Sequence, residues 1–185
     1  MDRLFVTIKW ALVGWGAVSL VFYLWSLTIF LASFSVHAST KSSQEASLNR
    51  FHMVLDNSGL GANRIEGALQ VYEKYPNPVR ALHFHAYASK MAPVDMNDLT
   101  QSMEGSDIHW YRGNHLPSVV DNAVTAIGQA TDELQVSWFP KTQEIRSDQI
   151  YVYSWNIDYA GVKPIEATLI FVRPSDQMVF YADFK

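Results

Sequence analysis

Residues 149–184 read QIYVYSWNIDYAGVKPIEATLIFVRPSDQMVFYADF and contain three segments in which apolar and polar side chains alternate. These segments are residues 149–159, 165–171 and 178–184. Alternation with a period of two predicts strands that bury one face. The turns between them, residues 160–164 and 173–176, are short, and short loops join antiparallel neighbours. The sequence therefore predicts an antiparallel β-meander at the carboxyl end.

Helices are expected upstream of the meander, where apolar residues recur at helical spacing and can cover one face of the sheet. The expected helices are residues 42–57, 63–74, 95–103 and one that starts near Pro117. Further strands or extended segments are expected at residues 79–88, 108–112 and 134–139. The predicted fold class is α+β, with one N-terminal transmembrane helix followed by a single domain of helices packed on the C-terminal antiparallel β-meander.

The transmembrane helix is predicted from residues 10–40, a stretch without Asp, Glu, Lys or Arg. A bilayer core needs about 20 apolar residues in a helix, so this stretch is long enough to span it. The sequence divides accordingly. We expect a short cytoplasmic tail at residues 1–9, a transmembrane helix at 10–36, a polar joint at 37–43 and an extramembrane α+β domain at 44–185.

Orientation follows from the basic residues beside the apolar stretch. Arg3 and Lys9 make the amino-terminal tail the more positive side, which by the positive-inside tendency stays in the cytoplasm. We therefore expect a single-pass protein of the bacterial inner membrane with a periplasmic domain and the lipid bilayer as a partner. The opposite orientation stays open, and so does a signal peptide cleaved after Ala38, although the apolar stretch is longer than the usual signal.

Composition excludes several kinds of partner. Residues 37–185 carry 12 of the 14 basic and 17 of the 18 acidic side chains, a net charge of −5. Nucleic-acid binding depends on Lys and Arg neutralising phosphates, so we expect no nucleic-acid partner. The chain has no cysteine, which excludes disulfides and thiolate metal sites.

Two histidines, His83 and His85, lie two residues apart in an expected strand, so both imidazoles point to one face. With Asp107 and His109 they could form a zinc site, but no zinc-binding signature accompanies them. A polar patch of the sheet and a proton-sensitive contact are the other interpretations. No serine lies in a recognisable nucleophile motif. We therefore expect no catalytic, cofactor-binding or metal-binding residues and no cofactor.

Protein contacts are expected at small and aromatic residues, because small residues let helices approach closely and aromatic residues dominate interfaces. These residues are Gly14, Trp15, Gly16 and Trp25 in the apolar stretch, and Tyr151, Tyr153 and Trp155 in the first strand of the meander. The alternative for the strand is that it lies centrally in the sheet, where these rings form core.

The function expected from these features is that of a membrane-anchored accessory or structural subunit of a larger membrane or cell-envelope assembly. It would act through protein–protein contacts, with other membrane subunits as partners, and would not be an enzyme. The alternatives are a membrane-tethered periplasmic domain that binds a peptide or a glycan, and an anchored enzyme.

Overall fold

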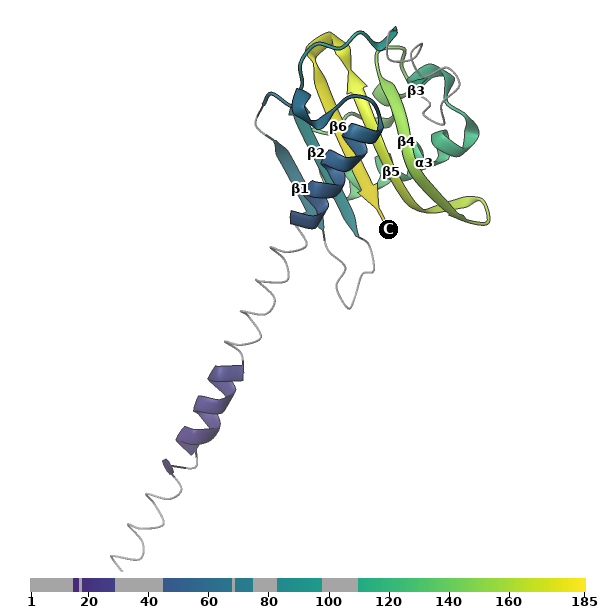
Figure 1. Cartoon of the computed structure of the whole chain (residues 1–185). Coiled ribbons are helices and arrows are strands. Elements are labelled where there is room, and N and C mark those ends of the chain that lie inside the picture. Colours follow the sequence, from purple (N-terminus) through teal and green to yellow (C-terminus); the bar gives the residue numbers. More distant parts are fainter. Residues whose placement is uncertain (1–14, 17, 29–44, 68, 75–82, 98–109) are drawn as a thin grey trace, which may run out of the picture. The chain divides into compact units, whose positions relative to one another are not determined.

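The computed structural model describes residues 15, 16, 18–28, 45–67, 69–74, 83–97 and 110–185 (Figure 1). The chain divides into two compact units, Met1–Ala46 and Ser47–Lys185. The polar joint predicted at residues 37–43 lies outside the described residues.

The first unit is helical at residues 15, 16 and 18–28, and their side chains are exposed. Within the described part of the chain, a helix with the length and apolarity needed to traverse a bilayer is absent. Residues 15–28 would rise about 20 Å as a helix, against a bilayer core of about 30 Å. The prediction of a single-pass transmembrane helix at residues 10–36 is therefore wrong for the described residues. The remainder of that span, which includes Gly14, lies outside them.

The second unit is built on one antiparallel sheet with the strand order β1-β2-β6-β5-β4-β3. The strands are β1 (Gln70–Lys74), β2 (Phe84–Lys90), β3 (Trp110–Arg112), β4 (Tyr151–Ala160), β5 (Lys163–Arg173) and β6 (Met178–Phe184). Strands β4, β5 and β6 form the predicted meander. The meander does not stand alone, because β1 and β2 extend it beyond β6 and β3 extends it beyond β4.

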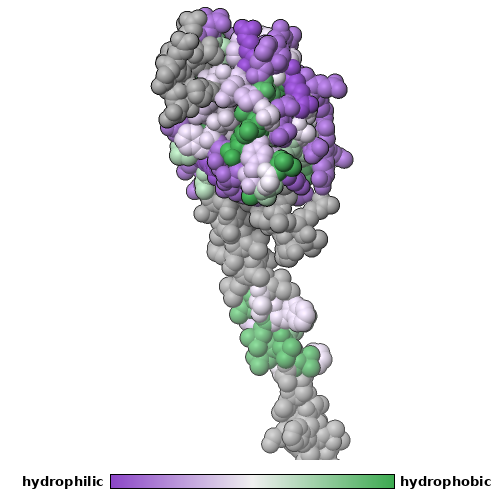
Figure 2. All heavy atoms as spheres, turned by 90° about the vertical axis from the view of Figure 1, so that its right-hand side faces the viewer, coloured by the Kyte–Doolittle hydropathy of each residue, from purple (hydrophilic) through white to green (hydrophobic). Residues whose placement is uncertain are grey.

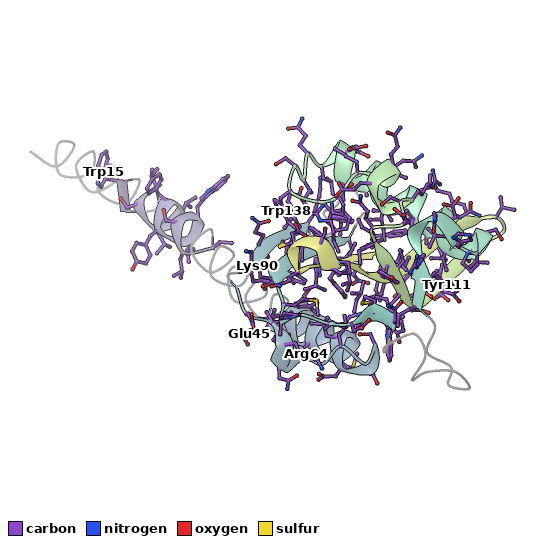
Figure 3. The ribbon with its side chains drawn as sticks, turned by 90° about the horizontal axis from the view of Figure 1, so that it is seen from above. Trp15, Glu45, Arg64, Lys90, Tyr111 and Trp138 are labelled. Atoms are coloured by element: carbon purple, nitrogen blue, oxygen red, sulfur yellow. The ribbon has the colours of Figure 1, made fainter. Side chains whose placement is uncertain are left out.

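Helices cover both faces of this sheet. The helix over residues 45–57, called helix 45–57 below, crosses one face, and α3 (Ser118–Glu133) lies on the other (Figure 1). The shorter helical elements are η1 (Ala62–Arg64), η2 (Gly113–His115), α4 (Thr142–Ile145) and η3 (Pro174–Asp176). Seen from above, the sheet separates Arg64 on the side of helix 45–57 from Trp138 on the side of α3 (Figure 3). The arrangement agrees with an α+β class, but the helices do not cover one face only.

Each face has its own hydrophobic cluster. Under helix 45–57, Phe51 lies 5.3 Å from the Tyr87 ring and 5.2 Å from the Tyr181 ring, measured between centroids. Beneath α3, Val124 and Ile127 pack among apolar residues of the sheet. Aliphatic and aromatic side chains that lose all contact with water each contribute about 1.5–3 kcal/mol, so the two clusters hold the helices in place.

Two predicted elements are wrong. Residues 63–74 were expected as one helix, but η1 ends at Arg64 and β1 pairs with β2. Residues 134–139 were expected as a strand, but they form turns, with Gln135 in the left-handed region at φ 56°. The buried side chains of Val136 and Phe139 explain their apolar pattern without a strand.

Candidate functional site

A row of polar side chains crosses the sheet beneath the first turns of helix 45–57. The strand register pairs Glu73 with His85, His85 with Asp183, and Asp183 with Thr168, from β1 through β2 and β6 to β5. Directly paired residues of antiparallel strands point to the same face. The four side chains therefore form one continuous polar row, and His85, Thr168 and Asp183 are buried.

A second polar row lies at the end of the sheet. His83 and Lys185 exchange both backbone hydrogen bonds, N to O at 3.0 and 2.9 Å. The Lys185 Nζ reaches Glu166 Oε1 of β5 at 2.7 Å. Beyond the aromatic rings under Phe51, this face of the sheet thus changes from apolar to polar and charged.

A chain of hydrogen bonds joins helix 45–57 to β1 and β2. The Nε2 atoms of His83 and His85 are 2.7 Å apart, which confirms that both rings share a face. The Nδ1 of His85 bonds to Ser47 Oγ, which lies 2.6 Å from Tyr87 Oη. The Tyr87 hydroxyl donates to Glu73 Oε1 at 2.5 Å. Five side chains, from helix 45–57, from β1 and from residues 83–87, are therefore connected in a single series, called the His83–Glu73 chain below.

An ion cluster lies beside this chain. Arg50 of helix 45–57 donates from Nη2 to Thr168 Oγ1 at 3.0 Å and to Glu166 Oε1 at 3.3 Å. The same Nη2 lies 3.5 Å from Asp183 Oδ1, which accepts a hydrogen bond of 2.7 Å from Thr168. Burial, the largest single effect, would lower the pKa of Arg50, but Asp183, Tyr181 and Glu166 together outweigh burial and raise it. The guanidinium thus stays charged and neutralises a buried carboxylate.

The environment makes both histidines weak bases. Burial, together with the neighbouring His83, lowers the pKa of His85 to about 4 from an ordinary value of 6.5. Burial also lowers the pKa of His83, and Lys185 and Arg50 add to that effect. Both imidazoles are therefore neutral at pH 7, as the hydrogen bond between their Nε2 atoms requires of at least one of them.

The chemistry that this arrangement supports is proton sharing. Ser47 contacts an imidazole, but only 6% of Ser47 is exposed and its oxygen also bonds to Tyr87, so a substrate would not reach it. In the part of the chain that the structure describes, no three His, Asp or Glu side chains are placed to hold a metal ion. Asp107 and His109, which the zinc interpretation needs, lie outside that part.

A second candidate region is the hairpin formed by β4 and β5. The register of the two strands shifts twice, and each shift leaves one residue without a partner, Trp155 on β4 and Ile165 on β5. Both unpaired residues are large and apolar, with 38% and 52% of their surfaces exposed. A β-bulge of this kind re-aims a side chain and is a built feature of a sheet.

Apolar surface continues around this hairpin. Val162 at its tip is 89% exposed and Val119 in the first turn of α3 is 50% exposed. The Tyr159 hydroxyl donates to the Val119 carbonyl oxygen, which fastens the hairpin to α3. Figure 2 views the molecule from the side of the hairpin and α3 and shows apolar side chains gathered among polar ones. We call Val119, Trp155, Val162 and Ile165 the hairpin surface.

The structure places the predicted contact residues in different environments. Tyr151 and Tyr153 are buried under the face that helix 45–57 covers, so the core interpretation holds for these two rings, and only Trp155 reaches the surface. The bulge at Trp155 explains the difference, because Ile157 beyond it packs on the opposite face, against the α3 cluster. Trp15, Gly16 and Trp25 are exposed on the helical residues of the first unit. Gly14 lies outside the described residues.

Sequence reasoning did not find Ser47, Tyr87 and Glu73 as partners of the two histidines. Ser47 is 38 residues from His85 and 40 from Tyr87, and no local pattern signals contacts of that range. It also did not find Val162 and Ile165. The sequence carries no signal for Ile165, because Ile165, Ala167 and Leu169 alternate in phase and only the observed strand pairing leaves Ile165 without a partner.

Comparison with known proteins gives no further guide to function: no protein-family model, no curated protein and no solved structure matches the chain. The function is therefore argued from the residues themselves.

Proposed function

We propose that residues 47–185 form a non-enzymatic interaction module that binds a partner protein through the hairpin surface, as a subunit of a larger protein assembly. The observation that supports this most is that both unpaired residues of the β4–β5 ladder, Trp155 and Ile165, are large apolar side chains exposed to water. An ordinary strand would bury such residues or replace them with polar ones.

The positions of the two bulges strengthen the argument. Removing either unpaired residue would leave all the existing pairs of the ladder in register, since Ser154 and Asn156 already face consecutive residues of β5. Pairing therefore does not need Trp155 or Ile165. Their retention on the surface is consistent with a role in contact, where aromatic and aliphatic anchors supply most of the binding energy.

The surroundings favour a protein partner of a particular chemistry. Asp158 and Lys163, both exposed, flank the hairpin surface with opposite charges. The net charge of −5 on residues 37–185 disfavours nucleic acid and anionic lipid headgroups. An apolar centre surrounded by polar residues of both positive and negative charge is typical of a protein–protein interface. We therefore expect a folded protein that presents an apolar surface of similar size.

Cross-linking from defined positions tests the proposal on the full-length chain in its source cells. A photoreactive amino acid at Val162 should capture one predominant partner protein in a stoichiometric adduct. The same amino acid at Met53, which is 46% exposed on helix 45–57, serves as the matched control and should not capture it.

A binding measurement with the captured partner completes the test. Ile165→Asp should weaken the affinity of the full-length chain at least about tenfold, roughly 1.4 kcal/mol, while Met53→Asp leaves it unchanged. The proposal fails if Val162 and Met53 capture the same proteins, or if Ile165→Asp binds the partner as tightly as the unaltered chain. Capture of a second copy of this chain would show a homo-oligomer in place of a different partner and would overturn that part of the proposal.

A further inference from the structure

We propose that the His83–Glu73 chain is a proton-operated latch, which holds Ser47 against β1 and β2 while the two histidines carry at most one added proton, and releases it when both are protonated. The latch acts at the amino-terminal end of the folded unit, since Ser47 is the first residue of the compact unit Ser47–Lys185. It is independent of the hairpin surface and goes beyond the interaction proposed above.

The hydrogen bonds of the His83–Glu73 chain fix the position of each of its hydrogens. The Tyr87 hydroxyl donates to Glu73, so its oxygen can only accept from Ser47. The single Ser47 hydroxyl hydrogen is then used, and Ser47 Oγ must accept from His85. His85 is therefore the Nδ1–H tautomer. Its Nε2 carries a lone pair and accepts from His83 Nε2–H across 2.7 Å. Every hydrogen points toward the Glu73 carboxylate.

The His83–Glu73 chain responds differently to a first and to a second added proton. One proton placed on His83 makes it an imidazolium that still donates from Nε2 to His85, so the series remains intact and its first hydrogen bond becomes charge-assisted. A second proton on His85 places two N–H groups and two positive charges against each other at the same 2.7 Å separation. Neither nitrogen can then accept, and the two rings must separate.

Charged and titratable groups surround the two histidines. Among the described residues, the titratable groups around them are Arg50 on helix 45–57, Glu73 on β1, Tyr87 on β2, Glu166 on β5, Tyr181 and Asp183 on β6, and Lys185 directly after β6. Asp183 is committed to Arg50 and Thr168, and Glu166 to Arg50 and Lys185. Glu73, at the far end of the series, is the carboxylate that the hydrogens point to. Burial already disfavours a charge on His85, so the second proton enters only under acid conditions.

The release is local because the latch binds only the first turns of the helix. Phe51, Val54 and Leu55, further along helix 45–57, are fully buried in the cluster beneath it. These apolar contacts do not depend on pH. Separation of His83 from His85 would therefore free Ser47 and loosen the residues next to it while the sheet and the rest of the helix stay folded.

Nuclear magnetic resonance of the full-length protein tests the hydrogen assignment directly. In a histidine ¹⁵N spectrum at pH 7, His85 should show a protonated Nδ1 and an unprotonated Nε2, and His83 a protonated Nε2. A protonated Nε2 on His85 at that pH would overturn the proposal. So would binding of one Zn²⁺ per chain through both Nε2 atoms, because the metal would occupy the place of the shared hydrogen.

Hydrogen exchange tests the release. After correction for the intrinsic rate, protection of the amides of residues 49–51 should fall at least tenfold between pH 6 and pH 4, with protection in β5 and β6 retained. His83→Gln leaves a single histidine in the series, so two charges cannot meet there and protection of the same amides should change less than twofold on acidification. His115→Gln, at an exposed histidine, is the matched control and should behave as the unaltered chain.

The outcomes separate clearly. Protection at residues 49–51 that stays constant down to pH 4 would overturn the latch, as would an unchanged tenfold fall in His83→Gln. If His83→Gln does not fold, the tautomer of His85 in the unaltered protein still decides the assignment on which the proposal depends.

Discussion

At the scale of single residues, His85 couples the stability of the fold to pH. The unfolded chain takes up a proton at His85 near pH 6.5, but the folded chain does so only near pH 4. Between these values the unfolded state binds more protons, so the free energy of unfolding is largest above pH 6.5 and falls as the pH is lowered. A shift of this size corresponds to a loss on the order of 2–3 kcal/mol at pH 4.

This dependence is measurable by urea unfolding at pH 7, 5.5 and 4. His85→Asn should unfold with a smaller difference between pH 7 and pH 5.5 than the unaltered chain, because its titration is removed. His115→Gln should keep the full difference. Carboxylates whose pKa is lowered by ion pairs, such as Glu166, stabilise the fold fully above their ordinary value of 4.5 and lose this contribution only below it, so the pH dependence above pH 5 comes from the histidines. Equal slopes in the unaltered chain and in His85→Asn would contradict the prediction.

A second residue-scale prediction concerns Gly113 in η2. A Cβ at this position would collide with the Ile145 carbonyl oxygen and lie 2.6 Å from the Ser147 carbonyl oxygen. Both obstacles are backbone atoms, which cannot rotate away as a side chain does. Gly113→Ala should therefore lower the free energy of unfolding by about 2–3 kcal/mol, at the upper end of overpacking costs.

The control for that prediction is Gly161 at the tip of the β4–β5 hairpin. Its backbone has φ 67°, a region that costs L-residues about 1 kcal/mol, but a Cβ added there would meet no atom within 4 Å. Gly161→Ala should cost less than Gly113→Ala in the same unfolding experiment. The reverse order would show that backbone conformation outweighs the steric contact.

At the scale of elements, we expect that Trp155 can be deleted from the β4–β5 hairpin with little loss of stability. Without Trp155, Ser154 and Asn156 would stand opposite Leu169 and Thr168 in an uninterrupted ladder, and every side chain would keep its face. The deletion should change the free energy of unfolding by no more than about 1 kcal/mol. If Trp155 anchors a partner, the same deletion should abolish binding.

Deletion of Ile157 is the matched control, measured by the same urea unfolding. It also allows an uninterrupted ladder, because Trp155 can then pair with Thr168, but it brings the polar Asn156 opposite Ala167 in the place of Ile157. The protein should lose at least about 3 kcal/mol or fail to fold, since Ile157 packs against the α3 cluster. Similar stability of the two deletion variants would refute the explanation of the bulge.

The same elements show what the sequence could predict. Alternation located β4, β5 and β6, and the helical spacing of Val120, Val124 and Ile127 located α3, because in each the pattern and the burial coincide. These sequence patterns failed where tertiary contacts decide the secondary structure. The region before β1 is bound to Lys90 through the Glu66 amide, at a point where Gly67 lets the two backbones approach. The apolar residues of that region recur at helical spacing, which does not indicate pairing with β2.

For the candidate site, alternation was enough to place His83 and His85 on one face, and a proton-sensitive contact was among the interpretations. The partners could not be found, because Ser47 and Glu73 reach the histidines through packing of helix 45–57 and pairing of β1, which are both long-range. The predicted transmembrane helix failed for a different reason. An uncharged stretch permits a spanning helix without requiring one, and the described residues within it form none of sufficient length.

At the scale of the molecule, the unit Ser47–Lys185 has two hydrophobic clusters that share one sheet. Residues of β2, β5 and β6 alternate between the clusters, so that Tyr181 faces helix 45–57 while its neighbours Phe180 and Ala182 face α3. Neither helix can lose its support without exposing strands that also support the other. We therefore expect the unit to unfold in a single cooperative transition, as small domains commonly do.

Paired substitutions on opposite faces test this expectation. Leu55→Ala beneath helix 45–57 and Ile127→Ala beneath α3 each remove a fully buried side chain, and each should lower the free energy of unfolding by about 2–5 kcal/mol. Because the sheet separates the two sites, the double variant should equal the sum within about 0.5 kcal/mol. In hydrogen exchange at increasing urea, residues 51–57 and α3 should lose protection together in every variant. If Leu55→Ala instead released helix 45–57 at a urea concentration where α3 stays protected, the two clusters would be separate folding units and the shared sheet would not couple them.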